Sequence, residues 1–245
     1  MNPLIIKRHY HSDDDQLDFR STGEEISTKK VNMVLLFDTS HSMADKDTGM
    51  QNSKIFELNR VFQKFVKLLE TNKTARSMGD IVIMTFGAND VSVVSSYDPI
   101  EKLKKIKFVP IGNTPMCEAI KKAHEGIIER RQYYKDNEIQ NYKPFIIVLT
   151  DGEATDFDKH EKFAKEFKKS ATDKKFKFYP FYLGAGQKLA ALKAFTPDSI
   201  EPRLIKDAKD LEDLFELLST SLDDPSKDPF EKTFGKGDDE DDDMG

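Results

Sequence analysis

Five oxygen-bearing side chains, at three separate places in the sequence, have the types and spacing that could hold a metal ion. They are Asp38, Ser40, Ser42, Thr114 and Asp151. In the first group, an acid is followed by hydroxyls two and four positions later. Hard divalent cations prefer oxygen ligands, and Mg²⁺ takes six of them while it retains several waters. We therefore expect a Mg²⁺ site, with Mn²⁺ as the alternative ion.

The charge of this ligand set predicts that one coordination position stays open. Two carboxylates and three neutral hydroxyls do not supply six strong protein ligands. Because Asp38 is the single anion of the first group, a bound ion remains electrophilic and attracts a further carboxylate. The set therefore predicts a site that a protein partner completes with its own Asp or Glu.

A structural role is the alternative interpretation of the same residues. Ser40 and Thr114 could cap helices, since Ser and Thr are favoured at helix N-termini. That would leave Asp38 and Asp151 as neighbouring acids without compensation, which lowers stability. The metal-binding interpretation accounts for all of these residues and is the one we prefer.

Unbroken apolar runs alternate with helical patterns along most of the chain. Such runs are typical of strands that are buried on both faces. They predict strands over residues 32–38, 81–86, 145–150, 176–183 and 203–205. Helical patterns lie over residues 54–69, 115–134, 159–169, 189–195 and 211–222. This alternation indicates a doubly wound α/β fold, with a mostly parallel central sheet flanked by helices on both faces.

The predicted sheet is expected to bring the candidate residues together. Residues 91–97 alternate loosely after a turn, so we expect them to pair with residues 81–86 as one antiparallel edge strand. Ligands of open α/β sheets bind beyond the carboxyl ends of the strands. Asp38 ends one apolar run and Asp151 follows another, so both are predicted to lie at that edge.

Composition and charge narrow the classes of function. The formal net charge is −6, but residues 223–245 hold ten acids and three lysines, so the rest of the chain is almost neutral. No basic stripe is present, and nucleic acid is therefore not an expected partner. The apolar runs are far shorter than the roughly 20 residues that span a bilayer, so we expect no membrane segment.

The same composition predicts the compartment and the domain organisation. Cys117 is the single cysteine, which excludes a disulfide within the chain and fits a reducing compartment. The first residues turn charged at Lys7 and lack the apolar core of a secretory signal, so we expect a cytoplasmic protein. We expect an arm over residues 1–30, one domain over 31–222 and an acidic tail over 223–245. The tail is either solvated and disordered or a competitor for the open metal position.

The order and spacing of these motifs resemble the metal-ion-dependent adhesion site (MIDAS) of von Willebrand factor A (VWA) domains. Residues 38–42, with the sequence DTSHS, look like the family's DxSxS element, and Thr114 and Asp151 look like its Thr and Asp elements. The likeness covers roughly residues 31–222. It implies direct contact of the metal with the two serines and often the threonine, and direct or water-mediated contact with Asp38 and Asp151.

The resemblance also implies a surface around the metal that selects the partner. His41 and Asn113 stand where the family commonly has glycine, and both flank ligands without being ligands. Together with Glu153, they are the residues that we expect to form the rim in contact with a partner. These departures bear on the choice of partner more than on metal binding.

Two stretches are similar to the bacterial TerY-like branch of this family, which is found with tellurium-resistance and stress systems. They are residues 112–116 (GNTPM) and 148–156 (VLTDGEATD). This similarity implies a bacterial protein that works in tellurium resistance or in stress and phospho-signalling. It also implies a partner such as a serine/threonine kinase or a PPM-type phosphatase.

Two functions from different classes fit these residues. The preferred one is a non-enzymatic, Mg²⁺-dependent module that captures an acidic residue of a protein partner. The alternative is a phosphohydrolase or phosphotransferase of the haloacid-dehalogenase type, with Asp38 as phosphoryl acceptor and Mg²⁺ as charge clamp. That chemistry usually uses a second acid two residues later, and position 40 is a serine. We therefore do not expect an enzyme.

Overall fold

The computed structural model describes most of the chain between the two termini. The described residues are 29–47, 49–184, 189–226 and 230. Most of the predicted arm over 1–30 and most of the predicted acidic tail over 223–245 lie outside these ranges, so both stay predictions.

Within the described part of the chain, six strands form one sheet in the order β3-β2-β1-β4-β5-β6. The strands are β1 (Val31–Asp38), β2 (Gly79–Gly87), β3 (Asp90–Ser96), β4 (Phe145–Thr150), β5 (Lys177–Leu183) and β6 (Arg203–Ile205). Neighbouring strands pair in parallel, except that β2 and β3 pair antiparallel at one edge. The predicted mostly parallel sheet with one antiparallel edge strand is confirmed.

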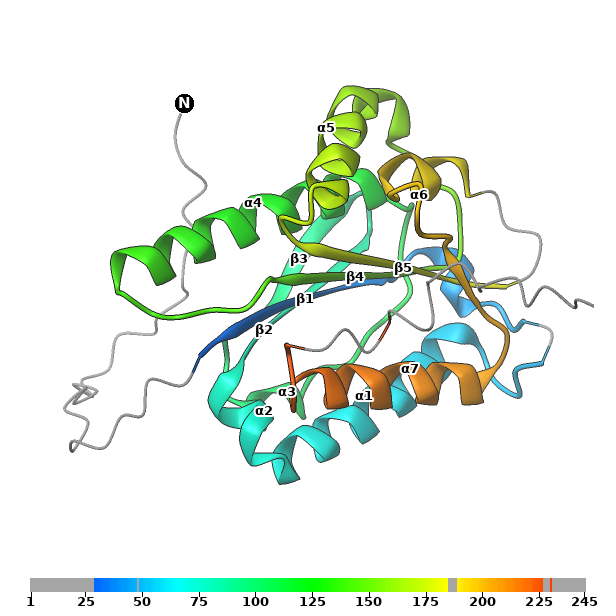
Figure 1. Cartoon of the computed structure of the whole chain (residues 1–245). Coiled ribbons are helices and arrows are strands. Elements are labelled where there is room, and N and C mark those ends of the chain that lie inside the picture. The colour runs from blue at the N-terminus through cyan, green and yellow to red at the C-terminus, as the bar shows by residue number, and fades with distance from the viewer. Residues whose placement is uncertain (1–28, 48, 185–188, 227–229, 231–245) are drawn as a thin grey trace, which may run out of the picture.

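Helices cover both faces of the sheet (Figure 1). One face carries α4 (Met116–Asp136), α5 (Glu161–Thr172) and α6 (Ala190–Phe195). The other carries α1 (Lys54–Thr71), α2 (Lys73–Met78), α3 (Ile100–Leu103) and α7 (Ala208–Ser221). The short 3₁₀ helices η1 (His41–Ala44) and η2 (Phe157–Lys159) lie in connecting loops. Two separate apolar cores, one on each side of the sheet, result from this layering.

The predicted elements agree with the observed ones in type and order, and their ends differ by a few residues. The helix expected over 115–134 runs from Met116 to Asp136, and the strand expected over 81–86 runs from Gly79 to Gly87. The elements α2, α3, η1 and η2 are too short to carry a periodic apolar pattern. The sequence therefore offers no signal for them.

Strand β1 lies inside the sheet, and its side chains alternate between the two cores. Met33, Leu35 and Phe37 face the α1 and α7 side, whereas Val34 and Leu36 face the α4 side. The whole strand is buried, which explains the unbroken apolar run over residues 33–37.

An aromatic cluster holds the carboxyl end of β1 against α1 and α7. The ring centroid of Phe37 lies 6.2 Å from that of Phe62, 5.2 Å from that of Phe108 and 5.8 Å from that of Phe215. All four rings are buried in edge-to-face or tilted contacts, which stabilise aromatic pairs beyond the burial of their area. This packing positions the next residue, Asp38.

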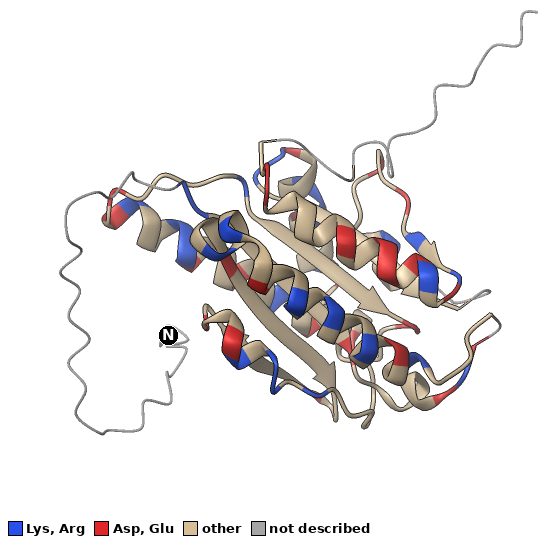
Figure 2. Ribbon diagram, turned by 90° about the horizontal axis from the view of Figure 1, so that it is seen from below, with Lys and Arg blue, Asp and Glu red and all other residues tan. Residues whose placement is uncertain are grey.

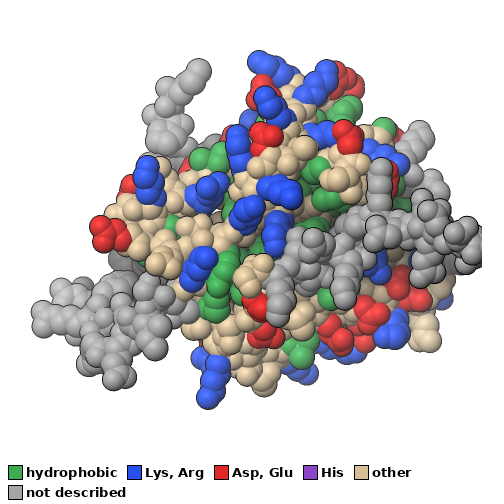
Figure 3. All heavy atoms as spheres, in the orientation of Figure 1, with side chains coloured by type: hydrophobic (Ala, Val, Ile, Leu, Met, Phe, Trp, Pro, Cys, Tyr) green, Lys and Arg blue, Asp and Glu red, His purple; other side chains and the backbone are tan. Residues whose placement is uncertain are grey.

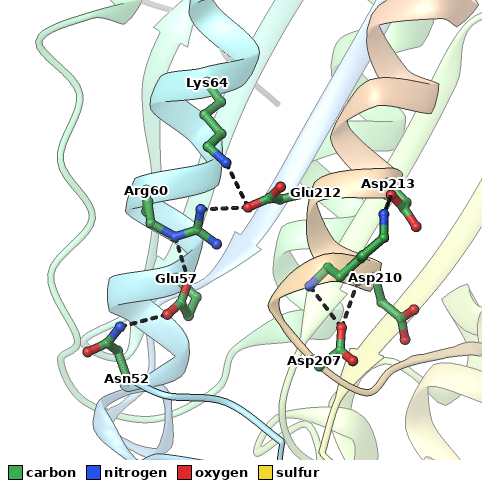
Figure 4. A network of polar contacts seen from close by, with 9 residues as sticks. Asn52, Glu57, Arg60, Lys64, Asp207, Asp210, Glu212 and Asp213 are labelled. Atoms are coloured by element: carbon green, nitrogen blue, oxygen red, sulfur yellow. Dashed lines mark hydrogen bonds and ion pairs between the residues drawn. The ribbon is translucent and has the colours of Figure 1, made fainter.

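Charged side chains on the outer surface connect α1 to α7 (Figure 4). Arg60 of α1 donates to Glu57 at 2.7 Å and to Glu212 of α7 at 2.5 Å. The ammonium of Lys64 lies 2.8 Å from the same Glu212 carboxylate. Figure 2 shows that charged residues are frequent along these helices, while the strands behind them are uncharged along most of their length. The network holds the N-terminal half of α1, which begins at Lys54, against its neighbour.

Charged side chains of both signs cover the visible surface (Figure 3). Lysine and arginine are most frequent over α4 and α5, and acids are most frequent along α7. Among the described residues, no helix is both long enough and apolar enough to cross a bilayer.

Candidate metal centre

The carboxyl ends of β1 and β4 bring the two predicted acids to one edge of the sheet. β1 and β4 are parallel neighbours, with Phe37 paired to Leu149. Asp38 is the last residue of β1, and Asp151 directly follows β4. Within the sheet, β2 lies on one side of β1 and β4 lies on its other side, so the strand order reverses direction at β1. The two acids therefore lie at the topological switch point, where open α/β sheets bind their ligands.

Two hydrogen bonds hold the Asp38 carboxylate in a defined orientation. The backbone N–H of Ser40 donates to Asp38 Oδ1 at 2.7 Å, and the hydroxyl of Thr150 donates to Asp38 Oδ2 at 2.6 Å. Asp38 and Thr150 have no exposed surface, and Ser40 is 2% exposed. The carboxylate is thus anchored before any ion binds.

The two serines of the first loop link it to Asp151. Ser42 Oγ donates to Asp151 Oδ1 at 2.7 Å and lies 3.0 Å from Ser40 Oγ. The other oxygen, Asp151 Oδ2, is buried and has no hydrogen bond. It lies 2.6 Å from Lys54 Nζ, so this close contact is an ion pair rather than a directed hydrogen bond.

Backbone hydrogen bonds place Thr114 beside both loops. The N–H of His41 donates to the carbonyl of Gly112 at 3.0 Å, and the N–H of Thr155 donates to the carbonyl of Thr114 at 3.0 Å. Gly112 has a φ of +69°, and a Cβ at this position would lie 2.3 Å from the Cα of Ala88. The turn therefore requires glycine, and it brings Thr114 next to the residues at the ends of β1 and β4.

The structure contradicts the helix-cap interpretation of Ser40 and Thr114. Neither hydroxyl caps a helix among the described residues. The N-terminus of α4 is capped across the loop by Asp156, whose two oxygens accept from the N–H of Cys117 at 3.1 Å and of Glu118 at 2.8 Å. The hydroxyls of Ser40 and Thr114 are thus left for another role.

The electrostatics of the site favour a cation. Burial, and then the nearby negative charge of Asp151, raise the pKa of Asp38 from 3.8 to about 6, although hydrogen bonds from Ser40 and Thr150 act in the opposite direction. A positive ion would relieve this unfavourable proximity. No group of three or more His, Cys, Asp and Glu side chains in the described part is arranged to hold a metal. A metal at this place would therefore rely on hydroxyls as well as on the two acids.

The residues present fit a divalent cation by three observations. All the candidate ligand atoms, in the hydroxyls as well as in the carboxylates, are oxygens, which suits hard ions. The two buried carboxylates lie close enough for one to raise the pKa of the other. One buried oxygen, Asp151 Oδ2, has no hydrogen bond and is paired with a cation, the Lys54 ammonium.

The sequence model of the von Willebrand factor type A domain matches residues 32–217, which is most of the chain. This chain belongs to the von Willebrand factor type A domain family. No curated protein sequence matches it.

Solved structures show the same fold as this VWA domain at low identity. The proximal thread matrix protein 1 from the mussel byssus, with a zinc-occupied MIDAS motif, is 15% identical with a TM-score of 0.56, over 80% of this chain and 46% of that chain. The vWF domain of the type V pili tip protein Mfa5 from Porphyromonas gingivalis is 13% identical with a TM-score of 0.55, over 82% of this chain and 97% of that chain. The chain spans about half the length of the mussel protein. At such identities the likeness shows the fold alone.

The three predicted rim residues of this VWA domain are exposed. His41 and Asn113 lie in the two loops that flank the acids, and Glu153 lies two residues beyond Asp151. Asn113 Nδ2 donates to Asn89 Oδ1 at 2.6 Å, which connects its loop to the turn between β2 and β3. Contact of these residues with a partner stays a prediction.

Three further residues take part in this VWA site although they are not among the predicted metal ligands or rim residues. They are Lys54, which pairs with Asp151; Thr150, which holds Asp38; and Asp156, which caps α4. Thr150 has a local signal, because it is a hydroxyl residue at the end of a strand next to a candidate ligand. Lys54 and Asp156 have none, since their contacts join segments far apart in the sequence.

Proposed function

We propose that this VWA domain is a non-enzymatic, Mg²⁺-dependent protein-binding module that captures an Asp or Glu of a protein partner. The observation that carries the proposal is the chain of contacts from Asp38 through Ser40 and Ser42 to Asp151. It gathers acids and hydroxyls at the sheet edge where this fold class binds ligands. The family membership and a zinc-occupied MIDAS in a mussel protein of the same fold support it.

The ligand set would be Asp38, Ser40, Ser42, Thr114 and Asp151. A bound Mg²⁺ would supply an electrophilic position for an outside carboxylate. The chain's own residues orient that position: Ser40 N–H and Thr150 hold Asp38, and Ser42 holds Asp151. We propose Mg²⁺ over Zn²⁺ because all these ligands are oxygens, and Mn²⁺ is the alternative ion.

The resemblance to the TerY-like branch extends the proposal to the biological setting. The stretches 112–116 and 148–156 support a bacterial, cytoplasmic protein of a tellurium-resistance or stress and phospho-signalling system. The partner would then be a serine/threonine kinase or a PPM-type phosphatase that offers an acidic residue.

No observation favours the alternative of a phosphohydrolase that uses Asp38. The side chain of Asp38 is buried, and both its oxygens accept hydrogen bonds. Position 40, where the general acid or base of that chemistry is needed, is Ser40.

A capture experiment in Mg²⁺ and in chelator tests the proposal. The immobilised full chain should retain a protein partner in Mg²⁺ and release it in EDTA, and Asp151→Ala should retain none. Asp158→Ala is the matched control, because it removes an exposed acid of the same loop and should behave as the unchanged protein. Equal capture in Mg²⁺ and EDTA, or by Asp151→Ala, would contradict metal-dependent binding.

A further inference from the structure

A buried lysine lies in the candidate metal site. Lys54 is the first residue of α1, and its side chain is only 7% exposed. Lysine is almost never buried to this extent unless its charge is paired. Its Nζ lies 2.6 Å from Asp151 Oδ2, and the Asp151 side chain has no exposed surface.

The position of this ammonium follows from the elements around it. The backbone N–H of Lys54 donates to the carbonyl of Asp45, which joins the start of α1 to the end of the loop that carries Ser42. The network of Arg60 and Glu212 holds the following turns of α1 against α7 (Figure 4). These contacts hold the start of α1 in place, and from there the Lys54 side chain reaches Asp151.

The charge of Lys54 stabilises the site when it contains no metal. Asp38 and Asp151 are buried beside each other, and a buried carboxylate without a counter-charge is strongly unfavourable. The ammonium supplies one positive charge to Asp151. It contacts the one carboxylate oxygen of the site that has no hydrogen bond.

The same charge opposes a divalent ion. A metal bound through Asp151 would lie close to the ammonium, and two positive charges at such short range in a poorly solvated place repel each other strongly. Metal binding must therefore displace the Lys54 head from Asp151 or proceed against its charge.

We propose that Lys54 is an internal counter-cation that competes with the divalent ion for Asp151 and thereby sets the metal affinity of the site. The proposal rests on the proposed function, since it concerns the same metal site. The competition weakens metal binding, so that a higher concentration of free metal is needed to half-fill the site.

Titration calorimetry of the metal-stripped full chain with MgCl₂, and separately with MnCl₂, tests this role. Lys54→Met removes the charge and keeps an unbranched apolar stem, and it should bind each ion about tenfold more tightly than the unchanged protein. Lys64→Met is the matched control. It removes an ammonium from the same helix that pairs with Glu212 on the surface, and it should leave both affinities unchanged.

Two further measurements separate the competing charge from a general effect on folding. Lys54→Arg keeps the positive charge and should bind metal as the unchanged protein does. In EDTA, Lys54→Met should melt at a lower temperature because Asp151 loses its counter-charge, and saturating Mn²⁺ should raise its melting temperature more than that of the unchanged protein. A Lys54→Met protein that folds only with Mn²⁺ present would support the same conclusion.

The outcomes distinguish this inference from the proposed function. If the unchanged protein and Lys54→Met bind metal equally, or Lys54→Met binds more weakly, the role of Lys54 is wrong and the metal-dependent function stands. If only Lys54→Met binds metal, the role of Lys54 stands and the metal-dependent function is wrong. If neither binds either ion, both are wrong.

Discussion

Asp38 is buried, yet both of its carboxylate oxygens accept hydrogen bonds, from Ser40 N–H and from the Thr150 hydroxyl. These bonds stabilise the ionised carboxylate, whereas burial and the charge of Asp151 favour the neutral acid. The balance puts its pKa at about 6, well above 3.8. A cation bound at this carboxylate would offset the free-energy cost of ionising it in a buried position.

The raised pKa of Asp38 predicts how metal-free stability depends on pH. The folded chain holds this proton more tightly than the unfolded chain, so the contribution of Asp38 to stability is fully present below pH 3.8 and is lost as the pH rises through about 6. Between pH 5 and 7 in EDTA, the unchanged protein should lose about 1.4 kcal/mol of stability relative to Asp38→Asn, which is the part of the loss that falls between pH 5 and the folded pKa of about 6. Thermal unfolding of both proteins at several pH values measures this difference.

Divalent metal should reverse the sign of this dependence. A metal ion binds the ionised carboxylate, so the stabilisation by Mg²⁺ should grow between pH 5 and 7, and Asp38→Asn should lack that growth. If the difference in stability between the unchanged protein and Asp38→Asn does not change with pH, Asp38 does not titrate in this range.

The strand ends and the loop before α4 show which parts of the site can be read from the sequence. β1 and β4 each contain an unbroken apolar run, so their ends, and with them Asp38 and Asp151, are predictable from the amino-acid pattern alone. Lys54 and Asp156 are not, because the contacts of Lys54 with Asp151 and of Asp156 with α4 form only through tertiary packing. Acids and lysines are frequent in this chain, and local sequence does not tell a buried one from a solvated one.

The cap that Asp156 gives to α4 yields a prediction for this element. Asp156→Ala removes both hydrogen bonds to the first turn of α4 and should lower the free energy of unfolding by about 1 to 2 kcal/mol. Urea denaturation measures this loss. Asp158→Ala, an exposed acid two residues later, should change stability by less than about 0.5 kcal/mol. Equal effects of the two substitutions would mean that the cap is not formed in solution.

The molecule as a whole includes a contact beyond the predicted domain end at residue 222. Phe230 has no exposed surface, and its ring centroid lies 4.4 Å from that of Tyr179 and 5.8 Å from that of Phe181, both in β5. An aromatic residue in an acidic stretch carries no periodic signal, so the sequence does not predict this contact. The contact joins residue 230 to the core on the α1 and α7 side of the sheet.

Phe230→Ala tests whether this contact belongs to the folded domain. Loss of a fully buried phenylalanine should lower the free energy of unfolding by about 3 to 5 kcal/mol. The control is Phe56→Ala on α1, where the side chain is 52% exposed and the loss should stay below about 1 kcal/mol. Chemical denaturation compares the two, and a neutral Phe230→Ala would place this residue outside the cooperative unit.

The central claim is that the acids and hydroxyls at the ends of β1 and β4 hold a divalent ion. Diffraction from crystals of the full chain with MnCl₂, recorded where manganese scatters anomalously, tests it most directly. We expect an anomalous peak bound, directly or through water, by oxygens of Asp38, Ser40, Ser42, Thr114 and Asp151, and no such peak in Asp38→Ala. A map at saturating Mn²⁺ with no peak among these residues, and with Lys54 still paired to Asp151, would contradict the claim.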